Sequence, residues 1–135
     1  MRRFIFVIVL LCGGHTVDAQ TIDSYEFRVY DAGATAPRQT TTVPLSAVQC
    51  NQSQPAPFTG TPVNPKHAYW DDPVNVGRAC HWDMSLNPTI PALPVGSYDG
   101  KLVAVNTAGS SPESNPAPFV RLSPPSAVTT FRLRP

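Results

Sequence analysis

Apolar and polar residues alternate along short segments of the chain, and turn-forming residues separate these segments. In residues 25–30 every second side chain, beginning with Tyr25, is apolar, whereas Glu26 and Arg28 alternate with them. A period of two residues is typical of a half-buried β-strand. The same reasoning predicts strands at residues 47–52, 67–70, 79–84 and 97–106. The strands at 67–70 and 79–84 are expected to form a hairpin.

Proline limits the kinds of secondary structure that this chain can form. The chain contains 16 prolines, none of them in the first 36 residues. Each proline removes a backbone donor and clashes with the preceding helical turn, so a helical bundle is excluded. The short, punctuated strands instead predict an all-β fold, an antiparallel sandwich or barrel, and we expect residues 53–65 to form a stiff, extended loop.

The first 19 residues have the three parts of a secretory signal. Arg2 and Arg3 give a positive start, an apolar run covers residues 4–12, and Ala19 ends a cleavage site of small residues. A retained membrane anchor would need about 20 apolar residues, and a lipid anchor on Cys12 is disfavoured by the large Leu11 before it. We therefore expect a signal at 1–19, one domain at 20–123, a proline-led strand or tail at 124–135, and no membrane span after cleavage.

The net charge of the chain limits the classes of partner that it is expected to bind. Charged residues make up 14% of the sequence and the formal net charge is +1. A chain without a basic field has little to attract nucleic acid or anionic lipid, so neither is expected as a partner.

The cysteines indicate an oxidising compartment. Once the signal is removed, Cys50 and Cys80 remain, and an even number of cysteines in an exported chain predicts a disulfide. The alternative is two buried free thiols. A crosslink of this span would contribute roughly 3–4 kcal/mol in the chain-entropy model, so its role is structural. Neither cysteine belongs to a C-x-x-C pair, which argues against zinc.

One segment carries a specific family resemblance. Residues 96–111 contain Tyr98, then small or apolar residues at alternate positions, then Ala-x-Asn-x-x-Gly-x-Ser, and this pattern resembles the penultimate strand and following turn of a fibronectin type III domain. The matching positions are Tyr98, Gly100, Leu102, Ala104, Asn106, Gly109 and Ser111. A looser similarity, Trp70-Asp71-Asp72-Pro73 with Asn75 and Gly77, resembles the second-strand tryptophan and its turn.

The resemblance implies an immunoglobulin-like, fibronectin type III-like sandwich of two antiparallel sheets. It implies that Tyr98 is the corner tyrosine, whose hydroxyl reaches the backbone, with Leu102 and Ala104 in the same strand. It also implies that Asn106 and Gly109 shape the last turn, where glycine supplies a positive φ. Gly100 stands where the family has a β-branched residue, and we expect weaker packing there.

The end of the chain, residues 127–134, resembles the opening strand of such a domain. Phe131 and Leu133 would lie on the side that seeks a sheet face, while Arg132 and Arg134 stay in water. The strand either returns to an edge of its own sandwich, which we favour, or adds to the edge of a second molecule and so allows self-association.

Two groups of side chains are candidates for binding chemistry. Oxygen and imidazole ligands are concentrated in one part of the chain, but paired aspartates before proline are ordinary turn residues, so no metal or cofactor is expected. These residues are His67, Asp71, Asp72, His81 and Asp83. Aromatic residues beside acids also resemble the platforms on which sandwich modules hold sugars, although tryptophan in a small sandwich is most often core. The candidate ligand-binding residues are Tyr69, Trp70, Asp71, Asp72 and Trp82.

The sequence offers no recognisable catalytic motif. It lacks a G-x-S-x-G elbow, an H-E-x-x-H helix and a phosphate-binding glycine loop, so an enzyme is not expected. Asn51-Gln52-Ser53 fits a glycosylation sequon without establishing its use. We expect a secreted or cell-envelope, non-enzymatic interaction or structural module whose partner is a protein at the cell surface or in the extracellular matrix. The alternative is a carbohydrate- or metal-binding accessory domain that uses Tyr69, Trp70 and Trp82 with the nearby acids.

Overall fold

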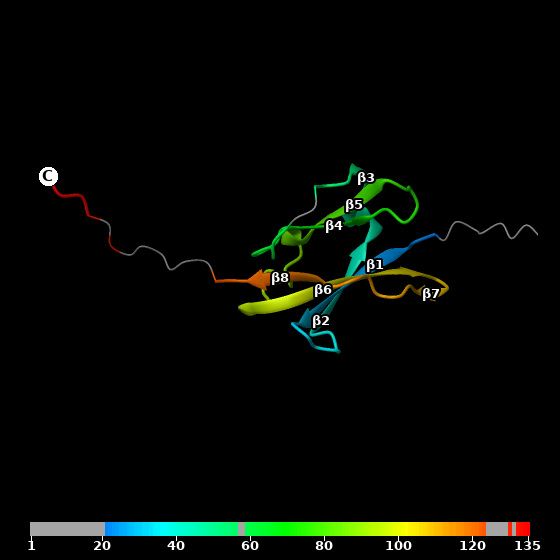
Figure 1. Ribbon diagram of the computed structural model, residues 1–135, viewed down its shortest axis with the longest axis horizontal. Coiled ribbons are helices and arrows are strands. Elements are labelled where there is room, and N and C mark those ends of the chain that lie inside the picture. Colours follow the sequence, from blue (N-terminus) through cyan, green and yellow to red (C-terminus); the bar gives the residue numbers. More distant parts are fainter. Residues whose placement is uncertain (1–20, 57–58, 124–129, 131) are drawn as a thin grey trace, which may run out of the picture.

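A computed structural model describes residues 21–56, 59–123, 130 and 132–135. Two antiparallel sheets lie one above the other (Figure 1). The larger sheet contains β1 (Ser24–Asp31), β2 (Gln39–Pro44), β6 (Gly96–Asn106), β7 (Gly109–Ser110) and β8 (Ala117–Arg121). The smaller sheet contains β3 (Val48–Ser53), β4 (His67–Asp71) and β5 (Arg78–Asp83), and the 3-10 turns η1 (Leu45–Ala47) and η2 (Met84–Leu86) adjoin it. The all-β, two-sheet prediction is confirmed.

The order of the strands puts β6 at the centre of the larger sheet. That sheet runs β2-β1-β6, and β6 then pairs with β8 along its first half and with β7 at its end. The smaller sheet runs β3-β5-β4, and its last two strands form the predicted hairpin.

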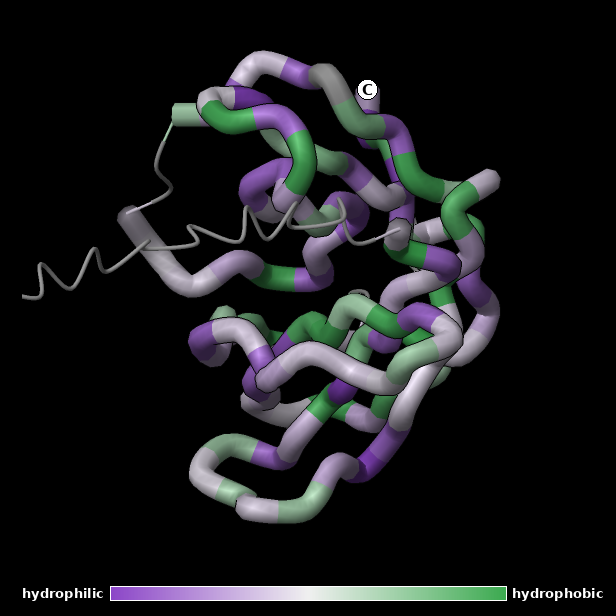
Figure 2. The backbone as a smooth tube through the Cα atoms, turned by 90° about the vertical axis from the view of Figure 1, so that its right-hand side faces the viewer, coloured by the Kyte–Doolittle hydropathy of each residue, from purple (hydrophilic) through white to green (hydrophobic). Residues whose placement is uncertain are grey.

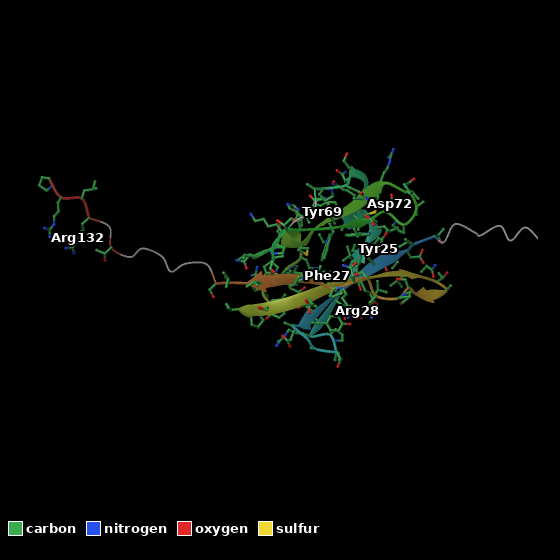
Figure 3. All side chains as sticks on the ribbon, in the orientation of Figure 1. Tyr25, Phe27, Arg28, Tyr69, Asp72 and Arg132 are labelled. Atoms are coloured by element: carbon green, nitrogen blue, oxygen red, sulfur yellow. A yellow bond between two sulfur atoms is a disulfide. The ribbon has the colours of Figure 1, made fainter. Side chains whose placement is uncertain are left out.

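The core lies between the sheets and follows the two-residue period. Tyr25 and Phe27 of β1 lie between the two sheets, on one side of the strand as predicted (Figure 3). Each meets a tryptophan of the smaller sheet edge to face. The tube in Figure 2 shows the hydrophobic and hydrophilic positions intermingled along the chain, as alternation requires. Met84, Ile90 and Leu93, from the segment between β5 and β6, pack against the same cluster.

Strand β2 was not predicted from the sequence. Three of its six residues are threonines, so the apolar alternation that marks the other strands is absent. Threonine is β-branched and fits a pleated sheet, and Thr41 and Val43 are buried while Thr42 between them is exposed. The missed signal was therefore β-propensity rather than hydrophobic period.

The proline-rich loop between β3 and β4 of the smaller sheet contacts the larger sheet through residues 62–64. Val63 forms a parallel bridge with Val120 of β8, and the amide of Val120 donates to the carbonyl of Pro62 at 2.9 Å. Asn64 extends this pairing, because its side chain both donates to and accepts from the backbone of Leu122. The loop thus occupies part of the outer edge of β8, which an unpaired strand would leave open to aggregation.

Two of the predicted segments lie wholly or partly outside the residues that the structure describes. The signal, residues 1–19, lies outside them, as does half of the predicted C-terminal strand at 127–134, Phe131 included. Leu133, which is described, is 84% exposed, so the expected docking of this side chain on a sheet of the same molecule is not observed. Among the described residues, no helix is long and apolar enough to cross a membrane.

Tyr98 lies at the start of β6 with its ring buried and its hydroxyl donating to the carbonyl of Pro94 at 2.8 Å. Leu102 and Ala104 follow on the same face and pack against the core. In the turn after β6, the side chain of Asn106 accepts from the amide of Ala108, and Gly109 has φ 138°. A side chain at Gly109 would be strained by this φ.

Replacing Tyr98 by phenylalanine should lower the free energy of unfolding by about 1 kcal/mol, because the carbonyl of Pro94 loses its donor while the ring stays in place. Pro94 is itself exposed, so water can partly replace the hydroxyl and the cost should not exceed this. Chemical denaturation of the two proteins measures the difference. Equal stability would show that the hydroxyl does not support the corner.

Gly100 is not a weak point in the packing, contrary to the expectation from the sequence. A Cβ built on Gly100 would lie 2.9 Å from two carbon atoms of the Phe27 ring. The ring therefore occupies the space that a larger residue would fill, and the glycine is needed for close approach between β1 and β6.

Gly100→Ala should destabilise the protein by about 1–3 kcal/mol, because Phe27 must leave its position in the core. Gly96→Ala is the matched control in the same strand. A Cβ on Gly96 would meet the Tyr98 ring at 3.5–3.6 Å, an ordinary contact, so its effect should stay within about 0.5 kcal/mol. Thermal melting of both variants gives the comparison, and similar losses would contradict the packing argument.

Candidate functional site

The outer face of the smaller sheet carries the most distinctive group of exposed side chains. Trp70 in β4 and Trp82 in β5 point into the core, so their neighbours in sequence must point outward. Figure 3 shows Tyr69 on this layer. We define the histidine–tyrosine face as five neighbouring side chains. They are His67 and Tyr69 of β4, His81 and Asp83 of β5, and Gln49 of β3, which pairs with His81.

The rings on this face contact one another. Tyr69 and His81 are direct cross-strand partners, and their rings stack with centroids 4.7 Å apart and planes inclined by 28°. Nε2 of His81 lies 2.9 Å from Nδ1 of His67, close enough for a hydrogen bond in which one nitrogen donates and the other accepts. Tyr69 is 49% exposed. The face therefore presents an ordered aromatic surface to solvent.

Asp83 stands opposite His67 across the hairpin. Its Oδ1 accepts from both the amide and the hydroxyl of Ser85, at 2.9 and 2.5 Å. These hydrogen bonds, and the two nearby histidines, lower the pKa of Asp83 below its ordinary value. A carboxylate is thus held beside the imidazoles in its charged form.

A shallow hollow of about 190 Å³ adjoins Tyr69 at the end of β4. Trp70 and Asp71 line it together with Gln54, whose side-chain amide donates to the Asp71 carboxylate at 3.0 Å. Trp70 contributes only part of its indole, because the ring packs edge to face on Tyr25. Its buried Nε1 has no hydrogen-bond partner among the described residues.

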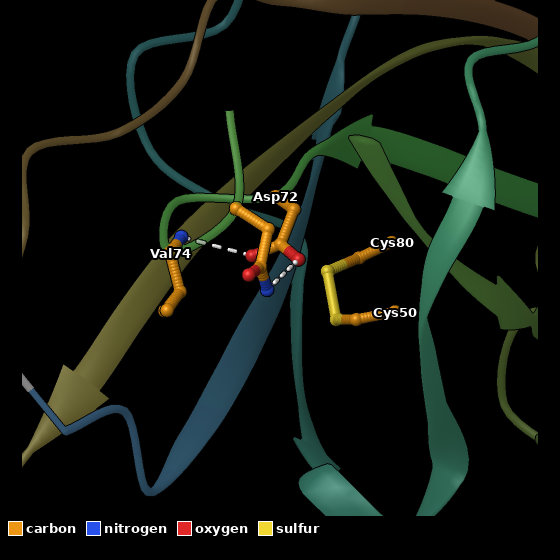
Figure 4. The surroundings of a disulfide bond; sticks show 5 residues. Cys50, Asp72, Val74 and Cys80 are labelled. Atoms are coloured by element: carbon orange, nitrogen blue, oxygen red, sulfur yellow. Dashed lines mark hydrogen bonds between the residues drawn. A yellow bond between two sulfur atoms is a disulfide. The ribbon is translucent and has the colours of Figure 1, made fainter. Parts of the chain in front are cut away.

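Two of the candidate ligand-binding residues are not available at the surface. Trp82 is 4% exposed and packs on Phe27 in the core, so the prediction that it forms part of a platform is wrong. Asp72 is also buried, and its carboxylate accepts from the amide of Val74 at 2.8 Å and from the side chain of Asn75 at 2.9 Å (Figure 4). These bonds close the turn after β4 and lower the pKa of Asp72, the bond from Asn75 contributing most.

Cys50 and Cys80 form a disulfide that links β3 to β5 within one sheet. It lies where the pairing of the two strands shifts register between Gln49 and Gln52. Asp72 lies beside the sulfur atoms (Figure 4), and with them it makes the only three-residue group of metal-ligand type among the described residues. Because both sulfurs are bonded to each other, this group has no thiolate to offer a metal.

The outer face of the larger sheet is covered by an ion-pair cluster that the sequence did not reveal. Glu113, in the segment between β7 and β8, accepts hydrogen bonds from Tyr30, Lys101 and Arg28. Arg28 also pairs with Glu26 on β1 at 2.7 Å, and the ammonium of Lys101 lies 4.5 Å from the centre of the Tyr30 ring. Glu113 lies in an irregular segment without a motif, so only the folded chain brings it to these partners.

A larger hollow of about 630 Å³ lies beside the turn after β6. Its lining includes Ile22, Val74, Ala104 and Ala108, and no lining side chain can titrate or ligate a metal through a charged group. The chemistry of the molecule therefore gathers on the histidine–tyrosine face rather than in this hollow.

Comparisons of the chain with protein-family models, with curated protein sequences and with solved structures find no match.

The charge on Glu113 should make stability depend on acid. Hydrogen bonds from Tyr30, Lys101 and Arg28 lower its pKa from 4.5 to about 2. A carboxyl group with a lowered folded-state pKa stabilises the fold above its ordinary pKa, and this stabilisation is lost as the pH falls from about 4.5 toward 2. We expect the melting temperature of the wild type to fall more steeply across this window than that of Glu113→Gln. Equal slopes would show that Glu113 is not the responsible group.

Proposed function

We propose that this chain is an exported, non-enzymatic binding module with a fibronectin type III-like sandwich, and that it holds a protein partner on the histidine–tyrosine face. The partner belongs to the cell surface or the extracellular matrix. The observation that carries the proposal is the half-exposed Tyr69 stacked on His81 in a sheet whose strands are crosslinked. Tyrosine gives large contact area at low cost in conformational entropy and is enriched in interfaces.

Two features support the finer fold assignment. The order β2-β1-β6-β8 corresponds to the C′-C-F-G strands of a variable-type immunoglobulin sandwich. The hydroxyl of Tyr98, at the start of β6, donates to the backbone four residues upstream, as the corner tyrosine of strand F does. Two features depart from the expected pattern. The disulfide joins neighbouring strands of one sheet rather than the two sheets. Trp70 lies in β4, an edge strand that follows β2 along the chain, rather than in a second strand.

Export is supported by the oxidised cysteine pair together with the N-terminal segment described from the sequence. Disulfides persist in secreted and cell-envelope proteins and are rare in the reducing cytosol. The disulfide also argues against a cysteine-dependent enzyme, since neither sulfur is free to act as a nucleophile. The two histidines hydrogen-bond to each other rather than to a hydroxyl nucleophile, which supports binding rather than catalysis.

The two outer faces of the sandwich differ in what they leave free for a partner. On the larger sheet, Arg28 and Lys101 are already paired with Glu113, so a partner would have to break these pairs or leave them in place. On the smaller sheet, the stacked rings face solvent. The second face therefore offers contact area without the desolvation of paired charges.

A carbohydrate ligand is the second candidate, and the hollow beside Tyr69 favours it. There an aromatic ring adjoins the carboxylate of Asp71 and the amide of Gln54, the kinds of groups that stack on and hydrogen-bond to a sugar. With Trp82 in the core and Trp70 mostly covered, Tyr69 would be the main stacking surface.

Tyr69→Ala should weaken partner binding at least about tenfold, because it removes the central exposed ring of the face. Proteins of the cell surface and matrix are first captured on the immobilised wild type and identified, and the affinity of each purified protein is then measured for both forms. Thr42→Ala, an exposed substitution on β2, is the control and should bind as the wild type does.

Unchanged affinity of Tyr69→Ala for every captured protein would contradict the proposed face. A panel of soluble polysaccharides tests the second candidate. Binding that is lost in both Tyr69→Ala and Asp71→Asn, with no protein partner affected, would replace the protein ligand by a sugar. Equal melting temperatures of the variants and the wild type establish that the fold is intact.

A further inference from the structure

His67 and His81 are brought together by the register of the β4–β5 hairpin. They lie on neighbouring strands as a diagonal pair, since Tyr69 is the direct partner of His81 and Asp83 is the direct partner of His67. Their closest ring nitrogens, Nδ1 of His67 and Nε2 of His81, are 2.9 Å apart on the outer face of the sheet. The two nitrogens therefore lie close enough together at the surface for one ion to bind both.

We propose that His67 and His81 bind one divalent transition-metal ion, with Cu²⁺ as the preferred ion. Two nitrogens about 2.0 Å from an ion at neighbouring corners of a square lie roughly 2.8–3.0 Å apart. Tetrahedral ligands at the same distance lie roughly 3.3 Å apart. The observed 2.9 Å is a hydrogen-bond distance, and a small movement of the rings brings the two nitrogens to either spacing. The preference for Cu²⁺ follows from the order of affinity of nitrogen ligands for divalent first-row metals, which is highest for Cu²⁺.

Binding replaces the hydrogen bond between the rings without loss or gain of a proton. In the metal-free pair, one imidazole donates its proton to the lone pair of the other. On binding, the donor ring carries its proton on its other nitrogen instead, and both facing lone pairs then coordinate the ion. Water molecules fill the remaining coordination positions on this outer face.

The surroundings fix the rings and favour a cation. Tyr69 stacks on His81 and so restricts the orientation of that ring. The carboxylate of Asp83 lies on the adjoining position, and both of its hydrogen bonds to Ser85 use Oδ1. Its negative charge offsets part of the charge of the ion. Of the five metal-type ligands recognised in the sequence, Asp71 is engaged by Gln54 and Asp72 is buried in its turn, which leaves the histidine pair with Asp83 beside it.

The test is a titration of the disulfide-bonded protein with Cu²⁺, followed by calorimetry and by electron paramagnetic resonance. The wild type should bind one strong equivalent, with hyperfine structure from two nitrogen ligands. His67→Ala and His81→Ala should each weaken this binding at least tenfold. Thr42→Ala, an exposed substitution on β2 of the larger sheet, leaves both imidazoles and Tyr69 in place, so it is the control and should bind Cu²⁺ as the wild type does.

Three outcomes would overturn the site. They are equal binding by the double variant His67→Ala/His81→Ala, a spectrum without two nitrogen ligands, and tighter binding of Zn²⁺ than of Cu²⁺. The inference does not rest on a protein partner. His67→Ala removes the metal pair and keeps the Tyr69–His81 stack, whereas Tyr69→Ala keeps the metal pair, so the two proposals fail separately.

Discussion

The fold depends on aromatic rings that pack edge to face across the sandwich. Tyr25 meets Trp70 at 4.9 Å between ring centroids, and Phe27 meets Trp82 at 5.5 Å. Such pairs add roughly 0.5–1.5 kcal/mol each beyond the area that they bury. Because side chains alternate along a strand, placing these tryptophans inward also places Tyr69 and the histidines outward. The candidate site is therefore a consequence of how the core is packed.

The disulfide compensates for a weakness of the smaller sheet. This sheet has three strands, and the ladder between β3 and β5 is interrupted near Gln49 and Gln52. A bulge at this point leaves a residue without its usual ladder partner. The Cys50–Cys80 crosslink, whose ends are 30 positions apart along the chain, contributes about 3–4 kcal/mol by the chain-entropy model. It also limits sliding of β3 against β5, on which the pairing of Gln49 with His81 depends.

The sequence predicted the features that depend on local periodicity and missed those that depend on register. The pattern of apolar residues located β1, β4 and β6, but the threonines of β2 gave no hydrophobic signal. The looser resemblance implied that Trp70 belongs to the second strand of the fold. Trp70 instead lies in β4, an edge strand of the smaller sheet that follows β2 along the chain. Tryptophan suits either a core or a platform, so only the structure assigned Trp82 to the core.

The contrast between the two outer faces explains why chemistry gathers on one of them. On the larger sheet, the segment between β7 and β8 carries Glu113 back over β1 and β6, and its carboxylate neutralises Arg28 and Lys101. That face is closed by the chain itself, and Tyr30 and Val103 beneath the segment are buried. The described part of the chain places no such acidic segment over β4 and β5, whose imidazoles are left to pair with each other. One imidazole donates to the other, and each ring keeps a second nitrogen that faces away from this hydrogen bond. The proposed partner and the proposed ion would therefore meet a face that no acidic segment among the described residues closes.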